Sequence, residues 1–387
     1  MESAATVSLF DISLPGPRDR VLKEWSGFIE LEPATTTKRG LPILLLGHPS
    51  AADWRWFPGL APVRLPPIGC HFLRDIEILG VGLPFVGNRY IRELSHTSDV
   101  GLQWLNSDDL PENPRREPPT HEATIDEPVL FVFGAGFPVF GHWLLDFLPR
   151  VAIAQRALGD LFHEFSIPLP DDTPEWVTEM LNTFCGVPAR QIRTFSRLTD
   201  RLACSRVCIP SFAHDGQYAP HGFMRDFYGS FQNAGSSQPT RRLCLSRRNF
   251  ERATRGVWRV FENRELFEEM AVAHGYEVVM PELLPFTEQV NLFRSAERII
   301  GEHGSGMHSA LFADPGTLVA SFPLHQIQLQ IGAAFGHCNV SVMRATKREE
   351  PGKPMHYTVA KEDLASLFVM LDTPNPTGIS ERWRMRE

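Results

Sequence analysis

A histidine and an aspartate four residues apart are the clearest candidates for acid–base chemistry in this sequence. His142 and Asp146 lie in a stretch with helical spacing, so both side chains are expected on one face of a helix. A helix dipole disfavours a cationic histidine near the N-terminus, and a neutral imidazole can accept a proton. We therefore predict that His142 is a general base oriented by Asp146. The alternative is a capping histidine beside an aspartate in a structural ion pair.

A glycine-rich turn and two arginines predict a site for an anion. A strand ends at Gly301, a tight turn follows, and a helix is expected to begin near Gly306, where backbone N–H groups can approach a diphosphate. Arg247 and Arg248 follow another strand, and guanidinium groups bind phosphate in a bidentate manner. The alternatives are a strand–turn–helix corner that needs glycine for positive φ, and a solvated basic turn.

A third segment, around Leu284–Gln289, begins a predicted helix. Phe286 can stack on a nucleotide base and Glu288 can bond ribose hydroxyls, but a capping threonine with a glutamate in the first turn is also ordinary helix chemistry.

Several other site classes lack their motifs. The glycine turn has Ser309 where a dinucleotide fingerprint needs its third glycine, and no Gly-Lys-Ser/Thr follows it. Ser305 has His303 and Met307 at the flanking glycine positions of a nucleophile elbow, so a serine hydrolase would need an irregular elbow. No two aspartates stand two residues apart, and the histidines lack zinc-ligand spacing, so we expect no metal site.

Composition indicates a soluble globular protein. The net charge of −8 argues against a nucleic-acid binder, because no basic surplus is available to neutralise phosphates. The six cysteines are scattered without CxxC spacing, which favours reduced core thiols. No segment has the length and apolar character of a signal peptide or a membrane span, so we expect a cytoplasmic protein whose membrane contact, if any, is peripheral.

The elements that must position these residues suggest two domains. Strand candidates at 41–46, 76–81, 128–134 and 202–209, with helix candidates at 142–158, 174–184 and 222–231, predict an α/β domain over residues 1–232. The polar segment 233–240 is a predicted linker. Strands alternate with helices over residues 241–345, which predicts a parallel, Rossmann-like sheet that binds ligands at the carboxyl ends of its strands. A C-terminal helix at 361–371 and a tail complete the predicted region 346–387.

In order along the chain, these segments resemble glycosyltransferase family 61. The resemblance covers roughly residues 128–371 and rests on HWLLDFLPR at 142–150, LSRR at 245–248, RVFENREL at 259–266, PFTEQVNLFRSAERIIGEHGSGMHSALFADPG at 285–316 and HYTV at 356–359. It implies the α/β GT-B fold, in which two Rossmann-like domains face a cleft, with the C-terminal helix able to pack back on the N-terminal domain.

The resemblance also implies an activity. A hexosyl- or pentosyltransferase of polysaccharide biosynthesis would move a sugar from a UDP-linked donor to a glycan or glycolipid, inverting the anomeric carbon, with no cofactor and no metal. His142 and Asp146 would be catalytic. The donor-binding candidates are Arg247, Arg248, Phe286, Glu288, Gln289, His303, Gly304, Ser305 and Gly306. Two other functions stay open: a non-catalytic protein that binds a nucleotide sugar or glycan, and a hydrolase that uses Ser305.

Overall fold

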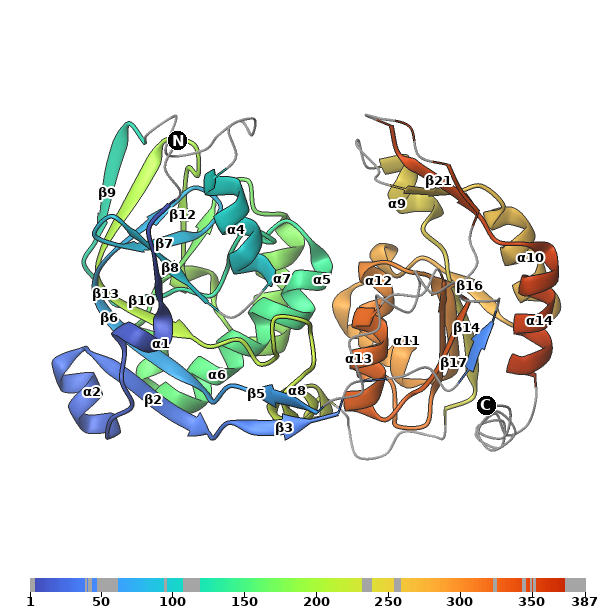
Figure 1. Ribbon diagram of the computed structural model, residues 1–387, viewed down its shortest axis with the longest axis horizontal. Helices are drawn as coiled ribbons and strands as arrows, with labels where there is room; N and C mark the ends of the chain where they lie inside the picture. Colours follow the sequence, from blue (N-terminus) through green and yellow to red (C-terminus); the bar gives the residue numbers. More distant parts are fainter. Residues whose placement is uncertain are drawn as a thin grey trace. The chain divides into compact units, whose positions relative to one another are not determined.

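The computed structural model describes residues 4–38, 40, 44–46, 62–93, 96–106, 119–231, 239–253, 259–322, 326–342, 346–348, 350 and 353–372. The chain forms two compact units (Figure 1). The first comprises Met1–Thr36 and Arg64–His221, and the second comprises Thr37–Val63 and Gly222–Glu387. Most of the predicted linker, residues 233–238, and residues 373–387 of the predicted tail lie outside the described residues. Among the described residues, no helix has both the length and the apolar character needed to cross a bilayer.

The first unit is built around an eight-stranded mixed sheet in which β13 and β6 are central neighbours. Its elements, with β3 and β5 spanning the boundary between the units, are β1 (Thr6–Ser8), α1 (Leu9–Ile12), α2 (Arg18–Glu24), β2 (Gly27–Glu32), β3 (Thr35–Thr37), β5 (Val63–Leu65), β6 (Ile68–Leu79), β7 (Leu83–Val86), β8 (Arg89–Arg92), α4 (His96–Asn106), β9 (His121–Ile125), β10 (Val129–Leu130), α5 (Phe140–His142), η1 (Trp143–Phe147), α6 (Leu148–Leu158), η2 (Gly159–Glu164), β11 (Ile167–Pro170), α7 (Glu175–Cys185), η3 (Ala189–Gln191), β12 (Ile192–Phe195) and β13 (Asp200–Pro210).

The expectation of a Rossmann-like sheet in this unit is wrong. Strand β6 runs antiparallel to β2, β7 and β13, and β7 runs antiparallel to β8. Tight turns join β6, β7 and β8, with positive φ at Gly80, Gly82 and Gly87. Short turns between consecutive strands produce antiparallel neighbours, whereas a Rossmann-like unit needs helical crossovers. Helix α6 packs on this sheet against β2, β6 and β13.

The second unit confirms the predicted alternation of strands and helices. Its elements are β4 (Leu44–Leu46), α8 (Gly222–Gly229), β14 (Arg241–Leu245), α9 (Arg248–Ala253), β15 (Arg259–Phe261), α10 (Arg264–Ala273), β16 (Glu277–Val279), η4 (Pro281–Leu283), α11 (Phe286–Arg294), β17 (Ala296–Glu302), α12 (Ser305–His308), η5 (Ser309–Phe312), β18 (Leu318–Phe322), α13 (Gln326–Phe335), β19 (Cys338–Val342), β20 (Thr346–Arg348), β21 (Met355–Thr358) and α14 (Lys361–Leu371).

Six of these strands form a parallel sheet in the order β16-β14-β17-β18-β19-β4. Helices α10 and α14 lie beside one face of the sheet, and α11 and α13 beside the other (Figure 1). Strands such as β18, LVASF, are buried along their whole length, as expected for a sheet covered on both faces. The smaller sheet β15-β21-β20 lies next to this core.

Two parts of the chain belong to the second unit against expectation. Strand β4, from the predicted N-terminal domain, pairs with β19 because the edge of the parallel sheet offers its backbone groups there. The C-terminal helix α14 packs into the core of the second unit. Its apolar side chains, Leu364, Leu367, Phe368 and Leu371, enter the core that Phe261 and Phe267 also form.

Candidate functional site

His142 lies where a helix of the first unit widens. Helix α5 runs into the π-helical turn η1 and then into α6, which carries Pro149 in its first turn. Proline has no N–H and its ring clashes with the carbonyl four residues earlier, so a regular helix cannot pass through this point unchanged. Such π-helical turns occur often at functional sites. The indole N–H of Trp143 donates to the Phe137 carbonyl at 2.7 Å and fixes the start of the turn.

Asp146 joins His142 to a second histidine. One carboxylate oxygen of Asp146 lies 2.5 Å from Nδ1 of His142, and the other lies 2.5 Å from Nε2 of His214. Nδ1 of His214 lies 2.5 Å from the backbone carbonyl of Asp215. Asp146 and His214 are fully buried, whereas the His142 side chain is 23% exposed. The network therefore leaves His142 as the member that a substrate can reach.

The charges in this network stabilise one another. Burial alone would raise the pKa of Asp146, but the hydrogen bonds and charges of His142 and His214 outweigh burial and hold that pKa below its usual range. Burial alone would lower the pKa of His214, but the hydrogen bond and charge of Asp146 raise it. The aspartate is therefore an ionised acceptor for both imidazoles.

Tyr218 completes the network from the loop after β13. Its ring stacks on His214 with centroids 4.8 Å apart, and its hydroxyl lies 3.4 Å from Nδ1 of His142. Tyr218 has φ of 63°, which is unusual for a residue with a bulky side chain and is often found where function requires strain. Burial, followed by the charge of Asp146, raises the pKa of the Tyr218 phenol, so the hydroxyl keeps its proton.

A buried ion pair supports the helix that carries His142. Arg150 is fully buried, donates to the Glu93 carboxylate at 2.9 Å and to the Pro210 carbonyl at 2.7 Å, and lies 4.4 Å from the ring centre of Phe212. Burial raises the pKa of Glu93, and the charge of Arg150 opposes that rise. Arg150 thus ties α6 to the end of β13, from which the His214 loop departs.

The second unit gathers arginines at the point where its strand order reverses. Strand β14 lies between β16 and β17. The chain passes from β14 to β16 on one side, and then from β16 to β17 on the other side of β14. In sheets of this kind ligands bind at the carboxyl ends of the strands beside such a point. Arg247 follows β14, and its Nη1 donates to the His303 carbonyl, after the end of β17, at 3.4 Å. Arg259 donates to the same carbonyl.

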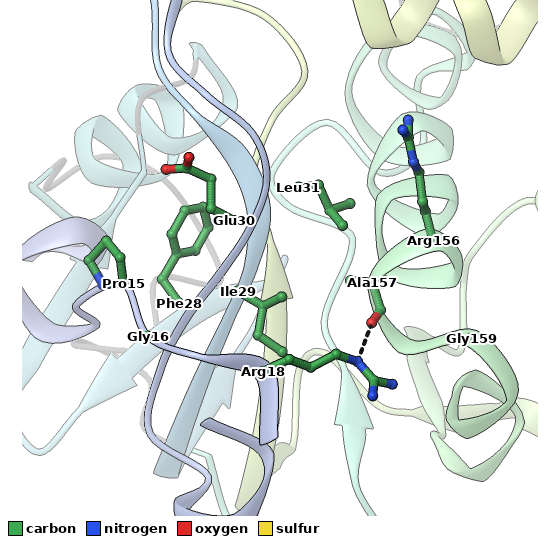
Figure 2. A pocket seen from close by; sticks show the side chains of 10 residues that line it. All are labelled: Pro15, Gly16, Arg18, Phe28, Ile29, Glu30, Leu31, Arg156, Ala157 and Gly159. Carbon is green, nitrogen blue, oxygen red and sulfur yellow. Dashed lines mark hydrogen bonds between the residues drawn. The ribbon is translucent and has the colours of Figure 1, made fainter. Parts of the chain in front are cut away.

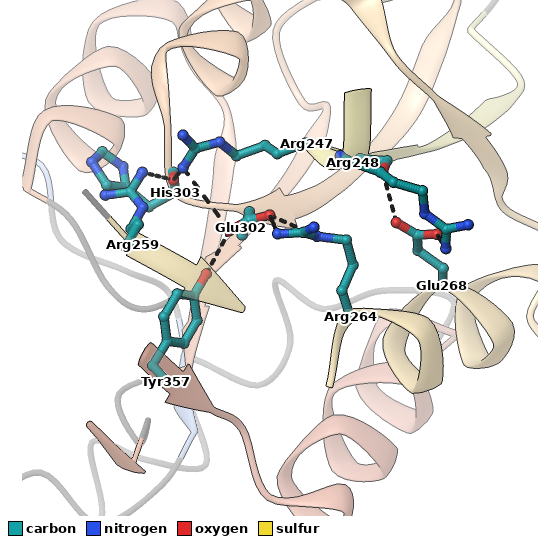
Figure 3. Close-up of polar contacts among 9 residues, drawn as sticks. Arg247, Arg248, Arg259, Arg264, Glu268, Glu302, His303 and Tyr357 are labelled. Carbon is teal, nitrogen blue, oxygen red and sulfur yellow. Dashed lines mark hydrogen bonds and ion pairs between the residues drawn. The ribbon is translucent and has the colours of Figure 1, made fainter. Parts of the chain in front are cut away.

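Glu302 is the centre of this cluster (Figure 3). Its carboxylate, 2% exposed, lies 2.9 Å from Nη2 of Arg264 and 3.9 Å from Nη1 of Arg247. It also accepts the Tyr357 hydroxyl at 2.7 Å. Burial, followed by the charge of Glu302, raises the pKa of Tyr357. Arg264 and Arg247 thus approach the Glu302 carboxylate, and Arg259 joins them at the neighbouring His303 carbonyl. Guanidinium groups are suited to binding anions.

Arg248 takes a different direction from Arg247. It donates to the Glu268 carboxylate on α10 at 2.6 Å, and Ser246 donates to the same carboxylate at 2.6 Å. The two arginines predicted to act together therefore separate. Arg247 lies with His303, and Arg248 is held by a buried glutamate (Figure 3).

Gly304, in the glycine turn, stands close to two arginine side chains. Gly304 has an extended φ of 169°, and a Cβ at this position would lie 3.3 Å from Nη2 of Arg259 and 3.4 Å from Cδ of Arg247. The predicted helix after the turn is a four-residue helix, α12, followed by the 3-10 turn η5. Ser305 and Gly306 open this short helix and are partly exposed. Gly304 thus lies beside the side chains of both arginines.

The start of α11 is placed mainly for packing. The Phe286 side chain is only 6% exposed, and Gln289 donates to the Leu284 carbonyl at 2.9 Å. Glu288 is exposed in the first turn. The roles in base stacking and ribose binding stay predictions.

The sequence-based prediction missed several residues of both sites. His214 and Tyr218 come from a loop with no motif of its own. Arg259, Arg264, Glu302 and Tyr357 stand inside the segments RVFENREL, PFTEQVNLFRSAERIIGEHGSGMHSALFADPG and HYTV, but nothing in their spacing shows that they meet.

A cavity of about 700 Å³ lies elsewhere in the first unit (Figure 2). It is lined along β2 and the end of α6, where Arg18 donates to the Ala157 carbonyl at 3.2 Å. Arg156 of the lining follows His142 by about 14 residues of nearly continuous helix, roughly 20 Å at the helical rise. This cavity is therefore separate from the His142 network.

Metal ligands are not gathered in the described part of the chain: it contains no cluster of three His, Cys, Asp or Glu side chains that could hold an ion. The six cysteines are free thiols, and all but Cys338 are buried.

A family model described as Glycosyltransferase 61 matches residues 140–320. The matched stretch includes His142, Asp146 and His214 of the first unit and the arginine cluster of the second, apart from Tyr357. No curated protein matches the sequence. The resemblance inferred from the sequence is thus confirmed for this stretch.

Proposed function

Residues 140–320 are a glycosyltransferase family 61 region, and from this premise we propose that the protein transfers a sugar from a nucleotide-sugar donor to a hydroxyl group of a glycan acceptor, inverting the anomeric carbon. The observation that carries the proposal is the His142–Asp146 pair: a partly exposed imidazole whose Nδ1 is held by a buried carboxylate at 2.5 Å. This arrangement directs the other ring nitrogen, Nε2, to a substrate proton.

In the proposed step the acceptor oxygen attacks the anomeric carbon while Nε2 of His142 takes the hydroxyl proton. The bond from the anomeric carbon to the donor phosphate breaks, and its electron pair leaves with the nucleoside diphosphate. Asp146 accepts the Nδ1–H of the imidazolium that forms and stabilises it. General-base assistance of this kind contributes roughly 10²–10⁴-fold to the rate.

The arginine cluster of the second unit is the proposed binding site for the donor diphosphate. Arg247, Arg259 and Arg264 bring three guanidinium groups together beside the Glu302 carboxylate and the His303 carbonyl, and guanidinium groups bind phosphate in a bidentate manner. As the bond breaks, charge grows on the leaving diphosphate, and preorganised donors stabilise that charge by about 3 kcal/mol each. The proposal therefore assigns the base to the first unit and the donor to the second.

The proposal has further parts that rest on the same site. The donor is UDP-linked, the arginines take the role that a metal ion has in other glycosyltransferases, and the product belongs to polysaccharide biosynthesis. The parallel sheet of the second unit, with its cluster beside the strand-order reversal, supports a nucleotide site.

Calorimetric titration with UDP and with UDP-linked hexoses, N-acetylhexosamines and pentoses, in buffer with EDTA, tests the donor site. We expect binding by the unsubstituted protein and at least tenfold weaker binding by Arg247→Ala. Arg241→Ala is the matched control, because Arg241 begins the same strand β14 and pairs at the surface with Glu277 at 2.5 Å.

Transfer of a radiolabelled sugar from the bound donor to a panel of glycans then tests the activity. Equal affinity in Arg247→Ala and Arg241→Ala would remove the arginine cluster from the donor site. Donor binding without transfer to any acceptor would favour a nucleotide-sugar-binding protein instead.

A further inference from the structure

Both ring nitrogens of His214 face hydrogen-bond acceptors. Nδ1 lies 2.5 Å from the backbone carbonyl of Asp215, which can only accept. Nε2 lies 2.5 Å from a carboxylate oxygen of Asp146, whose other oxygen accepts from His142. A neutral imidazole has a single N–H and satisfies one such acceptor, whereas an imidazolium has two and satisfies both.

We propose that His214 is held as a buried imidazolium and acts as a positioning residue: its charge offsets that of Asp146, so that His142 keeps Nε2 free to accept a proton. The inference rests on the proposed function in one respect, the role of His142 as the base.

The groups that surround His214 favour its cation. The imidazole is fully buried, and its ring centre lies 4.8 Å from that of Tyr218 and 5.5 Å from that of Phe212. Because the ring is buried, solvent water cannot donate to whichever acceptor a neutral imidazole would leave without an N–H. The pKa of His214 is raised, because the hydrogen bond and charge of Asp146 and the Asp215 carbonyl outweigh burial. The Asp215 carboxylate is itself engaged with the backbone N–H groups of Gln217 and Ala219, at 3.0 and 2.7 Å.

Charges on the neighbouring helix and strand do not replace this cation. Arg150 and Glu93 both interact electrostatically with Asp146, but they are paired with each other at 2.9 Å and their charges nearly cancel. His71, which also lies near Arg150, has a pKa lowered to about 3 by burial and by the charge of Arg150, so it is neutral. The Tyr218 phenol keeps its proton because burial raises its pKa. His214 therefore carries the charge that balances Asp146.

The consequence concerns the proton on His142. A buried carboxylate that no cation compensates stabilises the charged form of a neighbouring base. This raises the pKa of such a base by about 1–3 units. With His214 protonated, the Asp146–His214 pair is neutral overall, and Asp146 orients Nδ1–H of His142 without strongly favouring a second proton on that ring. Without the charge of His214, the Asp146 carboxylate would favour the imidazolium form of His142, in which Nε2 carries a proton and cannot act as a base.

Nitrogen-15 NMR of the full chain, labelled at histidine, tests the charge directly between pH 5.5 and 9. We expect both ring nitrogens of His214 to carry protons at pH 7. The His142 signals are assigned with His142→Gln. Those of His214 are assigned with His214→Gln or, if that variant does not fold, through contacts with the Tyr218 ring. A His214 ring with one unprotonated nitrogen at pH 7 would overturn the inference.

The pH profile of transfer tests the positioning role. In His214→Gln, which keeps a hydrogen-bond donor but loses the charge, the acid limb of kcat/KM should move up by about 1–3 pH units. His121→Gln is the matched control, because His121 also faces an aspartate, Asp200, at 3.3 Å but is 67% exposed. A lower rate at every pH with an unmoved acid limb would show that His214 has only a structural role. If no donor and acceptor support transfer, the proposed function fails, and the nitrogen-15 NMR signals of His214 still decide this inference.

Discussion

The backbone of Gly136 lies directly against the imidazole of His142. A Cβ at position 136 would stand 2.4 Å from Cδ2 of His142 and 3.0 Å from its Nε2. Such a contact cannot be accommodated without moving the ring, and the ring is held at Nδ1 by Asp146. Glycine at this position is therefore part of how the proposed base is placed.

Gly136→Ala is expected to lower transfer about 100-fold, because a displacement of the base by about 1 Å has effects of this size. Donor affinity should be unchanged, since the arginine cluster lies in the other unit. The comparison is Gly216→Ala in the same unit, where a Cβ would meet no atom within 4 Å. Rates of labelled-sugar transfer and calorimetric affinities measure both effects, and an unaffected rate in Gly136→Ala would contradict this placement of His142.

His142→Ala should lower kcat several hundredfold and leave nucleotide binding nearly intact. The reason is that His142 is proposed to act on the acceptor proton, and general-base assistance accounts for roughly 10²–10⁴-fold. His163→Ala serves as the control, since His163 is an exposed histidine at the far end of α6. Steady-state transfer with saturating donor measures the change. Transfer at the normal rate would reject His142 as the base.

Glu302→Gln should destabilise the second unit by about 3–5 kcal/mol, because removing one partner of a buried ion pair leaves an uncompensated charge. Glu302 is 2% exposed and is in contact with Arg264 and Tyr357. Glu277→Gln removes the exposed partner of Arg241 and should change stability by less than about 1 kcal/mol. Urea unfolding curves give both values. Equal, small effects would mean that the arginines do not depend on Glu302.

Acid should destabilise the first unit through His71. Its pKa is lowered to about 3 by burial and by the charge of Arg150, whereas an unfolded histidine titrates near 6.5. The contribution of neutral His71 to the free energy of unfolding is complete above pH 6.5 and is lost as the pH falls towards 3. In that interval only the unfolded chain binds a proton at this histidine.

This histidine should lower the free energy of unfolding by about 2 kcal/mol between pH 7 and pH 5. In His71→Phe the new ring lies between Phe10 and Phe28. The decrease in the free energy of unfolding between pH 7 and pH 5 should then be smaller by about 2 kcal/mol than in the unsubstituted protein. Burial lowers the pKa of His337, in the second unit, to about 4. This histidine is unchanged in the variant, so part of the pH dependence of the free energy of unfolding should remain. Urea unfolding at the two pH values measures the difference, and an identical pH dependence with and without His71 would disprove the assignment.

The sequence was most informative where chemistry is local. The spacing of His142 and Asp146 is a property of one helix, and the C-terminal helix at 361–371 was predicted with the bounds that the structure has. Residues that meet only through the fold were not predictable from spacing. His214 reaches Asp146 across 68 positions of sequence, and Tyr357 reaches Glu302 across 55.

The mixed sheet of the first unit was missed for a related reason. An apolar run such as Ile76–Leu79 is compatible with both a parallel and an antiparallel sheet. Only the short turns at Gly82 and Gly87 distinguish the two kinds of sheet. The separation of Arg247 from Arg248 was likewise not visible, because it depends on Glu268 from the following helix.

Strand β4 has a consequence for how the protein is made. Its partner β19 lies near the other end of the chain, so on the ribosome β4 is synthesised long before the edge that receives it exists. The first unit, from Arg64 to His221, is translated in the interval. A recombinant fragment that starts at Gly222 would therefore lack one strand of its own sheet. The second unit alone should be obtained by co-expressing residues 37–63 or by circular permutation rather than by simple truncation.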